Sequence, residues 1–272
     1  MFQFSDEYIQ QLILSIFQGD ITEYDLPENL YYSIADYLKK GLYKGYGVSI
    51  SSLTKQINLK AAEFDLSDLE LLSELRTNIY MFSAAKTYSQ VKGMTEKLIS
   101  DKGTIRPFSD FKADAEQIFE QYNDTWLKTE YDTAIGQGTE AVRWNGIEKN
   151  KDILPYLRYS AIGDACEICQ PLDGLTAPVE DAVWDTVAPL NHFNCLCILE
   201  QLDDKEGKEK ETDEEERNKT VEDVSGKMND VFKMNAGRDG YVFKEDHPYF
   251  TVPKEDKEFA QKNFDLPIPK HD

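Results

Sequence analysis

The cysteines constrain the fold of this chain more than any other residues. All four lie between positions 166 and 197 of a 272-residue sequence, first in Cys166-Glu-Ile-Cys169 and then in His192-Phe-Asn-Cys195-Leu-Cys197. A Cys-x2-Cys knuckle places two thiolates about one tetrahedral edge apart, and the second cluster can supply the other ligands of a zinc ion. The spacing therefore predicts a small module that folds around one zinc ion.

Five residues are candidate metal ligands, but a tetrahedral ion takes only four of them. Cys166 and Cys169 form the knuckle, so His192, Cys195 and Cys197 offer three donors for two places. On a strand, Cys195 and Cys197 point to the same face and can both bind. In the alternative, which we favour, His192 and Cys195 bind and Cys197 is a packed thiol, because a two-residue gap chelates with less strain.

The charge of the chain restricts its partners. Acidic residues outnumber basic ones 51 to 30, which gives a formal net charge of −21. Tight binding to nucleic acid in general needs many Lys and Arg contacts to phosphate, so we expect at most weak or indirect contact with DNA. Such a surface favours a basic or locally basic partner.

The apolar pattern and the first residues of the chain indicate the cellular compartment in which the protein folds. No apolar run approaches the roughly twenty residues that span a bilayer, so we expect no membrane contact. The start, Met1-Phe2-Gln3-Phe4-Ser5-Asp6-Glu7, lacks the features of a signal peptide. We therefore expect folding in a reducing cytosol, where clustered cysteines are metal ligands more often than disulfides. Two disulfides, or a reduced cluster without metal, are the alternatives.

Residues 1–150 are predicted to form a helical domain. Ser5 can cap a first helix, whose apolar residues share one face and which Gly19 ends. A second helix is predicted to start at Pro27 and to be closed by the glycines at 41, 45 and 47.

Two longer helices are predicted to follow within the same domain. Apolar residues at helical spacing indicate one helix over residues 67–99 and another over residues 109–144. Gly103 and Pro107 separate the two.

The pattern changes near Pro155. Residues 151–202 are predicted to form a small α+β zinc-knuckle module, with strands at 156–162 and 197–202 and an Asp-Gly turn at 173–174. Residues 203–223 are almost all charged or polar, which predicts a flexible acidic linker.

Residues 224–272 are predicted to form a C-terminal tail that acts as a short docking segment. Order is expected to return at residues 228–232, and Leu266-Pro267-Ile268-Pro269 favours an extended end.

A family resemblance is carried by Leu157-Arg158-Tyr159, Asp164-Ala165-Cys166-Glu167-Ile168-Cys169, Leu172-Asp173-Gly174, Trp184 and Pro189-Leu190-Asn191-His192-Phe193-Asn194-Cys195-Leu196-Cys197. Over roughly residues 110–202 the chain resembles the Mu protein-F-like domain of tailed-phage minor head proteins, also called phage head morphogenesis proteins. The family pattern has Cys-x2-Cys, Leu-Asp-Gly, and two prolines before a closing His-x-x-Cys-Arg-Cys. Ala188 replaces the first proline, and Leu196 replaces the arginine.

The resemblance implies a minor capsid protein of a tailed phage or prophage. Such a protein joins the procapsid at low copy and contacts the portal protein and capsid or scaffold proteins. It assists head morphogenesis, genome packaging or genome delivery. The implied location is the virion, with the host cytoplasm as the site of assembly. Zinc would have a structural role in this viral assembly protein.

We expect no enzymatic activity. A catalytic zinc keeps an open position and needs a nearby acid or base. The order of motifs differs from the zinc deaminase signature, and no His-Glu-x-x-His is present. His247, beside Pro248, is interpreted as a structural turn residue. The alternatives are a zinc-dependent hydrolase or nuclease that acts on phage DNA, or a cytosolic zinc-ribbon adaptor. Neighbouring portal and terminase genes would separate the adaptor from a head protein.

Overall fold

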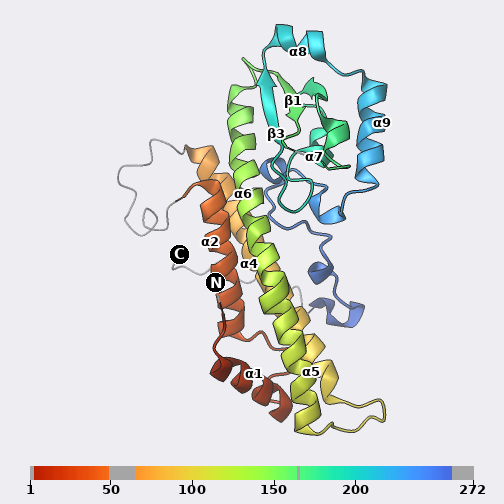
Figure 1. Cartoon of the computed structure of the whole chain (residues 1–272). Helices are drawn as coiled ribbons and strands as arrows, with labels where there is room; N and C mark the ends of the chain where they lie inside the picture. Colours follow the sequence, from red (N-terminus) through yellow and green to blue (C-terminus); the bar gives the residue numbers. More distant parts are fainter. Residues whose placement is uncertain (1–2, 49–64, 164–165, 259–272) are drawn as a thin grey trace. The chain divides into compact units, whose positions relative to one another are not determined.

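The computed structural model describes residues 3–48, 65–163 and 166–258 of the chain, coloured along the sequence in Figure 1. The chain divides into two compact units. The first unit comprises Met1–Gly41, Arg76–Asp132 and Glu245–Asp272, and the second comprises Leu42–Leu75 and Thr133–Lys244. The predicted segment Leu266–Pro269 and the motif residues Asp164 and Ala165 lie outside the described residues.

The predicted helices are present. They are α1 (Asp6–Gln18), α2 (Glu28–Tyr46), α4 (Leu66–Thr95), α5 (Phe108–Glu120) and α6 (Leu127–Asn150), with a π-helical turn, η2 (Gln121–Trp126), between α5 and α6. Ser5 caps α1 by accepting a hydrogen bond from the backbone N–H of Tyr8, and Gly19 ends the helix at φ 80°. The local capping signals of the sequence therefore placed this helix correctly.

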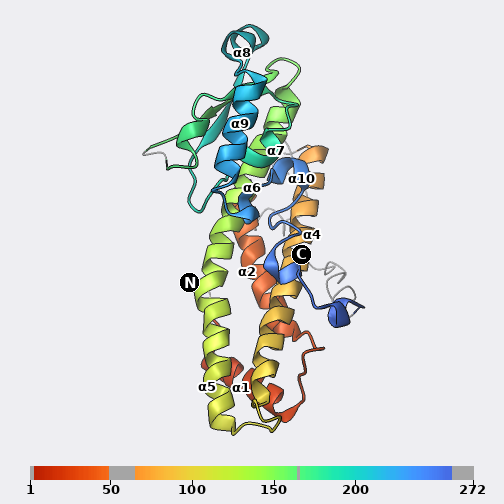
Figure 2. The same ribbon diagram turned by 90° about the vertical axis from the view of Figure 1, so that its right-hand side faces the viewer.

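In the first unit, α1 lies beside α5, as Figure 2 shows. Ile13 and Ile16 of α1 are fully buried, and so is Phe111 of α5. Phe17 packs its ring against Phe111 with centroids 5.6 Å apart. The apolar faces predicted from the sequence thus form the contact between these helices.

The prediction that Gly41 and Gly45 close the second helix is wrong. Both residues lie inside α2, which continues to Tyr46, and Gly47 at φ 81° ends it. A Cβ atom at Gly45 would come within 2.0 Å of the carbonyl oxygen of Ile135 on α6. These glycines therefore permit close backbone approach between helices, a use that the sequence pattern does not distinguish from helix termination.

The second unit contains a three-stranded antiparallel sheet. Its strands are β1 (Tyr156–Ser160), β2 (Thr176–Pro178) and β3 (Ile198–Leu202), in the order β2-β1-β3. β1 and β3 are the two predicted strands, whereas the sequence pattern does not predict the three-residue β2. Leu157 and Tyr159 of β1 are fully buried in the core beneath the sheet. The described part of the chain is thus mainly helical, with a small three-stranded sheet.

The interval predicted as a flexible linker instead forms two helices, α8 (Asp204–Lys210) and α9 (Glu214–Ser225). Asp203 and Asp213 cap them, so part of the acidic composition serves as helix starts. Arg217 of α9 is mostly buried and pairs with Asp181 at 2.7 Å, and Val224 is 1% exposed. Packing against distant residues orders this stretch, and a composition argument does not detect such contacts.

Shorter elements complete the described chain. They are η1 (Glu96–Leu98), η3 (Gln170–Leu172), α7 (Trp184–Val187), η4 (Asp230–Phe232), α10 (Ala236–Asp239), η5 (Pro248–Phe250) and η6 (Lys254–Asp256). In the second unit, α9 contacts α7, as Figure 2 shows, and it also contacts η3. In the first unit, the carboxylate of Asp256 accepts a hydrogen bond from Tyr88 at 2.5 Å and pairs with Lys92, so this part of the C-terminal segment is docked on α4.

Candidate metal centre

The first half of the cluster is held by a tight turn. The backbone N–H of Gln170 donates to the carbonyl of Cys166 at 2.9 Å, and that of Leu172 donates to Cys169 at 3.1 Å. Asp173 then accepts from the N–H of Ala161 at 2.9 Å. Gly174 follows at φ 82°, a conformation that glycine adopts without strain. These bonds tie the knuckle to the end of β1.

The second half lies in the loop that leads into β3. The N–H of Cys195 donates to the carbonyl of His192 at 3.1 Å, and Asn194 adopts a left-handed φ of 60°. Cys197 directly precedes β3 and is 4% exposed. A short turn and a strand entrance thus position His192, Cys195 and Cys197 in the loop before β3.

The structure brings the five predicted ligands together in two overlapping groups. The donor atoms of Cys166, Cys169 and His192 lie within 4.8 Å of one another, and so do those of Cys169, Cys195 and Cys197. Cys169 belongs to both groups. All four cysteines are free thiols, so the alternative of two disulfides does not match this arrangement.

One sulfur–sulfur distance in the cluster matches the edge of a tetrahedral zinc site. The Sγ atoms of Cys169 and Cys195 are 3.9 Å apart. A Zn–S bond of about 2.3 Å implies an edge of about 3.8 Å between two sulfur ligands of one zinc ion. The donor set, of soft thiolates with one imidazole, is also the set that zinc prefers. The residues present therefore could hold one zinc ion.

The electrostatics of the cluster favour a bound cation. The pKa of Cys195 is lowered to about 5 by its hydrogen bond with Cys169, by backbone N–H groups and by nearby His192. The same thiol contact, together with burial, raises the pKa of Cys169. The contact thus makes Cys195 the more readily ionised of the two thiols. A metal ion would bind the thiolate forms, because thiolates are the binding form of cysteine.

A buried hydrogen-bond chain supports Cys169. The Tyr159 hydroxyl donates to Cys169 Sγ at 3.3 Å, and Asn191 Nδ2 donates to that hydroxyl oxygen at 3.0 Å. Both side chains are fully buried. Such partners fix the orientation of a metal ligand. Sequence reasoning missed this role of Tyr159 and Asn191. Their positions beside the two ligand clusters were the available signal.

Three carboxylates near the candidate ligands in sequence or space have defined environments. Asp173 accepts the Ala161 N–H, and Asp185 pairs with Arg238 at 2.5 Å. Burial raises the pKa of Glu140 on α6 to about 7, and the negative charge of Cys195 adds to this effect. Glu140 was not among the predicted residues.

His247 lies outside this cluster, in the first unit. It caps η5 by accepting a hydrogen bond from the N–H of Tyr249. This contact agrees with its interpretation as a structural turn residue.

The fold and the donor cluster define a helical protein with a small module suited to a metal ion. The model of the family "Phage Mu protein F like protein" matches residues 33–200, which is more than half of the chain. The chain therefore belongs to this family, whose members are phage head morphogenesis proteins, and the resemblance carried by its motifs is confirmed. No curated protein and no solved structure matches the chain significantly. Within the described residues, no helix is long and apolar enough to cross a membrane.

Proposed function

We propose that the protein is a minor head protein of a tailed phage or prophage, which acts in the virion through contacts with the portal and with capsid or scaffold proteins. The family match over residues 33–200 carries this proposal. It covers most of α2, all of α4, α5 and α6, and the candidate metal module, so the family likeness is not limited to the cysteines. The role assigned is binding during head assembly, genome packaging or genome delivery.

In this proposal one zinc ion cross-links the module. Cys166, Cys169 and Cys195 bind it, and either His192 or Cys197 completes the set, since both lie within 4.8 Å of Cys169. Bound zinc supplies a rigid cross-link between the loop after β1 and the loop before β3. Four protein ligands leave no open position, so the site is structural and the protein is not an enzyme.

Mass spectrometry of purified virions tests the proposal. We expect the chain in virions at low copy, and portal protein in pull-downs of the tagged chain from infected cells. A Cys166→Ser variant should give defective heads or particles that fail to deliver DNA, whereas Leu196→Ser in the same region should not, because Leu196 is 72% exposed. Absence of the chain from virions, with the protein abundant in the cytosol, would support the adaptor alternative instead.

A further inference from the structure

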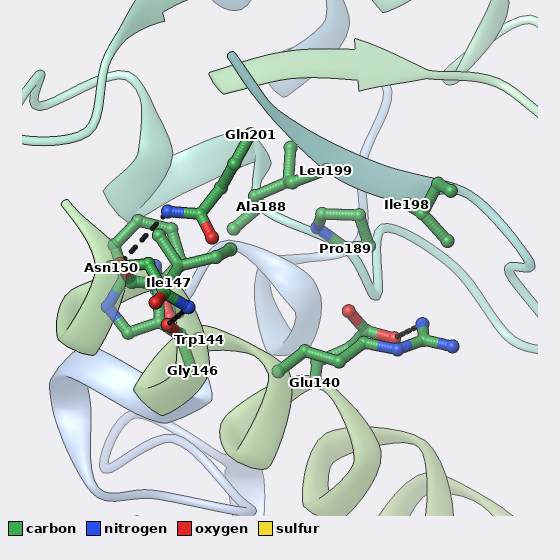
Figure 3. A pocket seen from close by; sticks show the side chains of 12 residues that line it. Glu140, Trp144, Gly146, Ile147, Asn150, Ala188, Pro189, Ile198, Leu199 and Gln201 are labelled. Carbon is green, nitrogen blue, oxygen red and sulfur yellow. Dashed lines mark hydrogen bonds and ion pairs between the residues drawn. The ribbon is translucent and has the colours of Figure 1, made fainter. Parts of the chain in front are cut away.

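A pocket of about 410 Å³ lies between α6 and β3 in the second unit, as Figure 3 shows. Glu140 and Gln201, which line it, already have partners. Glu140 pairs with Arg143 at 2.6 Å, and Gln201 donates to the carbonyls of Ile147 and Leu154. These groups therefore do not indicate a ligand. A buried charge pair in the first unit is different, because one of its oxygen atoms lacks a partner.

The charge pair consists of Lys86 on α4 and Glu130 on α6. The Lys86 ammonium lies 2.9 Å from Glu130 Oε1, and the Lys86 side chain is 0% exposed, against 10% for that of Glu130. Among the described residues, Glu130 Oε2 is buried and has no hydrogen-bond partner. Burial lowers the pKa of Lys86 and raises the pKa of Glu130. Both shifts disfavour the charged forms, so burial of this pair costs free energy.

Tyr249 of the C-terminal segment covers this pair. The Lys86 ammonium donates to the Tyr249 hydroxyl at 3.3 Å, and that hydroxyl donates to Glu130 Oε1 at 3.2 Å. The ammonium also lies 5.1 Å from the centroid of the Tyr249 ring, within the range of a cation–π contact. Tyr249 is 9% exposed, and its ring centroid lies 5.3 Å from that of Phe82 on α4. Removal of this segment would therefore open the charge pair to water.

A second anchor of the C-terminal segment follows at Asp256. The Asp256 carboxylate accepts a hydrogen bond from Tyr88 at 2.5 Å and pairs with Lys92, and both of these residues belong to α4. The turns η5 and η6 carry Tyr249 and Asp256, respectively. Two side chains thus hold the segment on α4, beside which Figure 2 shows it.

The charges beneath the segment lower the free energy of its release. A segment that leaves an apolar groove exposes apolar surface, at roughly 25 cal/mol per Å². Release of this segment also returns Lys86 and Glu130 Oε2 to water, and their recovered hydration offsets part of that free energy. Segments of this kind can open locally at a free energy below that of global unfolding.

We infer that residues 245–258 form a releasable strap, which leaves α4 and α6 as one unit while these helices remain folded, and which then admits water to Lys86 and Glu130. The first unit thereby has a closed state and an open state. A partner that binds the uncovered helices, or the released strap, shifts the protein towards the open state. The strap belongs to the first unit, whereas the candidate metal centre belongs to the second.

Acetylation of the purified full chain with a trace of N-hydroxysuccinimide acetate at constant pH, read at Lys86 by mass spectrometry, measures the open state. Asp256→Asn tests whether the strap moves as one unit, because Asp256 contacts Tyr88 and Lys92, whereas Tyr249 contacts Lys86. We expect acetylation of Lys86 to rise about tenfold in this variant, since a hydrogen bond to a charged group is weakened. Hydrogen exchange of the Tyr249 N–H should rise by the same factor.

Glu255→Gln is the matched control, since Glu255 is exposed beside Asp256 and the variant loses the same charge. It should leave acetylation of Lys86 unchanged, and amide exchange across α4 should stay as in the native chain for both variants. If Asp256→Asn does not fold, as judged by circular dichroism, Tyr88→Phe removes one donor to Asp256 and should act in the same direction. Unchanged acetylation in the anchor variant, an equal rise in the control, or a rise matched by amide exchange across α4 would overturn the inference. The last result would show unfolding of the helix rather than release of the strap.

Discussion

Cys169 belongs to both groups of candidate metal donors, so it is the residue on which the proposed metal centre would depend most. We expect the purified protein to carry close to one zinc per chain and Cys169→Ser to carry far less. The variant should also lose several kcal/mol of unfolding free energy in residues 156–202, since metal binding is coupled to folding there. Elemental analysis after desalting and denaturant titration measure both effects.

The same assay decides the fourth ligand. Of His192→Asn and Cys197→Ser, the variant that removes a true ligand should lose zinc, and the other should keep it. Leu196→Ser is the control for changes to this loop. Full zinc content in the Cys169→Ser variant would contradict the assignment of the site.

His247 gives the first unit a predictable response to acid. Burial lowers its pKa from 6.5 to about 4, and nearby Lys86 adds to this effect while Asp246 opposes it. A lowered pKa means that protonation disfavours the folded state. The neutral His247 ring therefore contributes to the stability of the folded state above pH 6.5, and this contribution is lost as the pH falls towards 4.

Denaturant titrations at several pH values test this contribution against His247→Asn, which keeps a capping acceptor. After allowance for partial exposure of the ring, the native chain should lose about 2 kcal/mol more than the variant between pH 6.5 and 4. Effects of zinc release cancel in the comparison. Parallel profiles for the two proteins would show that His247 titrates normally in the folded state.

At the scale of elements, the contact between α2 and α6 in the second unit depends on Gly45. A Cβ atom at this position would overlap the backbone carbonyl of Ile135, which cannot move independently of α6. Gly45→Ala should therefore lower the unfolding free energy by about 2 kcal/mol.

Gly146→Ala is the matched control for Gly45. Gly146 lies inside α6, and a Cβ atom there would meet no atom within 4 Å beyond the helix's own backbone. The alanine variant should leave stability unchanged or raise it by up to about 1 kcal/mol, because alanine favours a helix more than glycine does. Thermal unfolding of the Gly45→Ala and Gly146→Ala variants measures the difference in stability between them. Equal stability of the two variants would show that α2 and α6 can move apart at little cost.

Arg217 anchors α9 to the rest of the second unit. It pairs with Asp181 at 2.7 Å and donates to the carbonyl of Thr212 at 2.9 Å. We expect α9 of the native chain to resist limited proteolysis and Arg217→Ala to be cut within residues 211–225, because removal of a buried partner frees the helix. Lys219→Ala, at an exposed position of the same helix, should behave like the native chain. Rapid cleavage of the native chain in this interval would favour the flexible linker expected from composition.

At the scale of the whole molecule, a structural zinc predicts binding without turnover. Purified zinc-loaded protein should neither cleave DNA nor hydrolyse generic ester or phosphate substrates. Glu167→Gln should leave phage assembly intact, whereas Cys166→Ser should impair it. Nuclease assays and plaque counts measure these outcomes. Metal-dependent turnover that a carboxylate variant abolishes, with zinc content retained, would favour the hydrolase alternative.

The sequence by itself determined the features that are encoded within a few residues. Ser5 and Gly19 delimit α1 because capping depends on local backbone groups. Helical spacing located α4 and predicted one helix where α5, η2 and α6 follow one another. Ligand spacing located the candidate metal donors and the family. The Cys-x2-Cys spacing is local in the sequence, so it can be recognised without knowing the fold.

The tertiary structure alone decided which distant residues meet. Composition does not show that Arg217 forms an ion pair with Asp181. It therefore predicts a linker where the chain forms α8 and α9. Nor does it show that Gly45 faces Ile135, or that Tyr159 and Asn191 support Cys169. Each depends on burial against residues far away in the chain. Burial of an unpaired charge costs free energy. The fold removes much of that cost by placing an oppositely charged partner beside it, so a charged segment can be ordered.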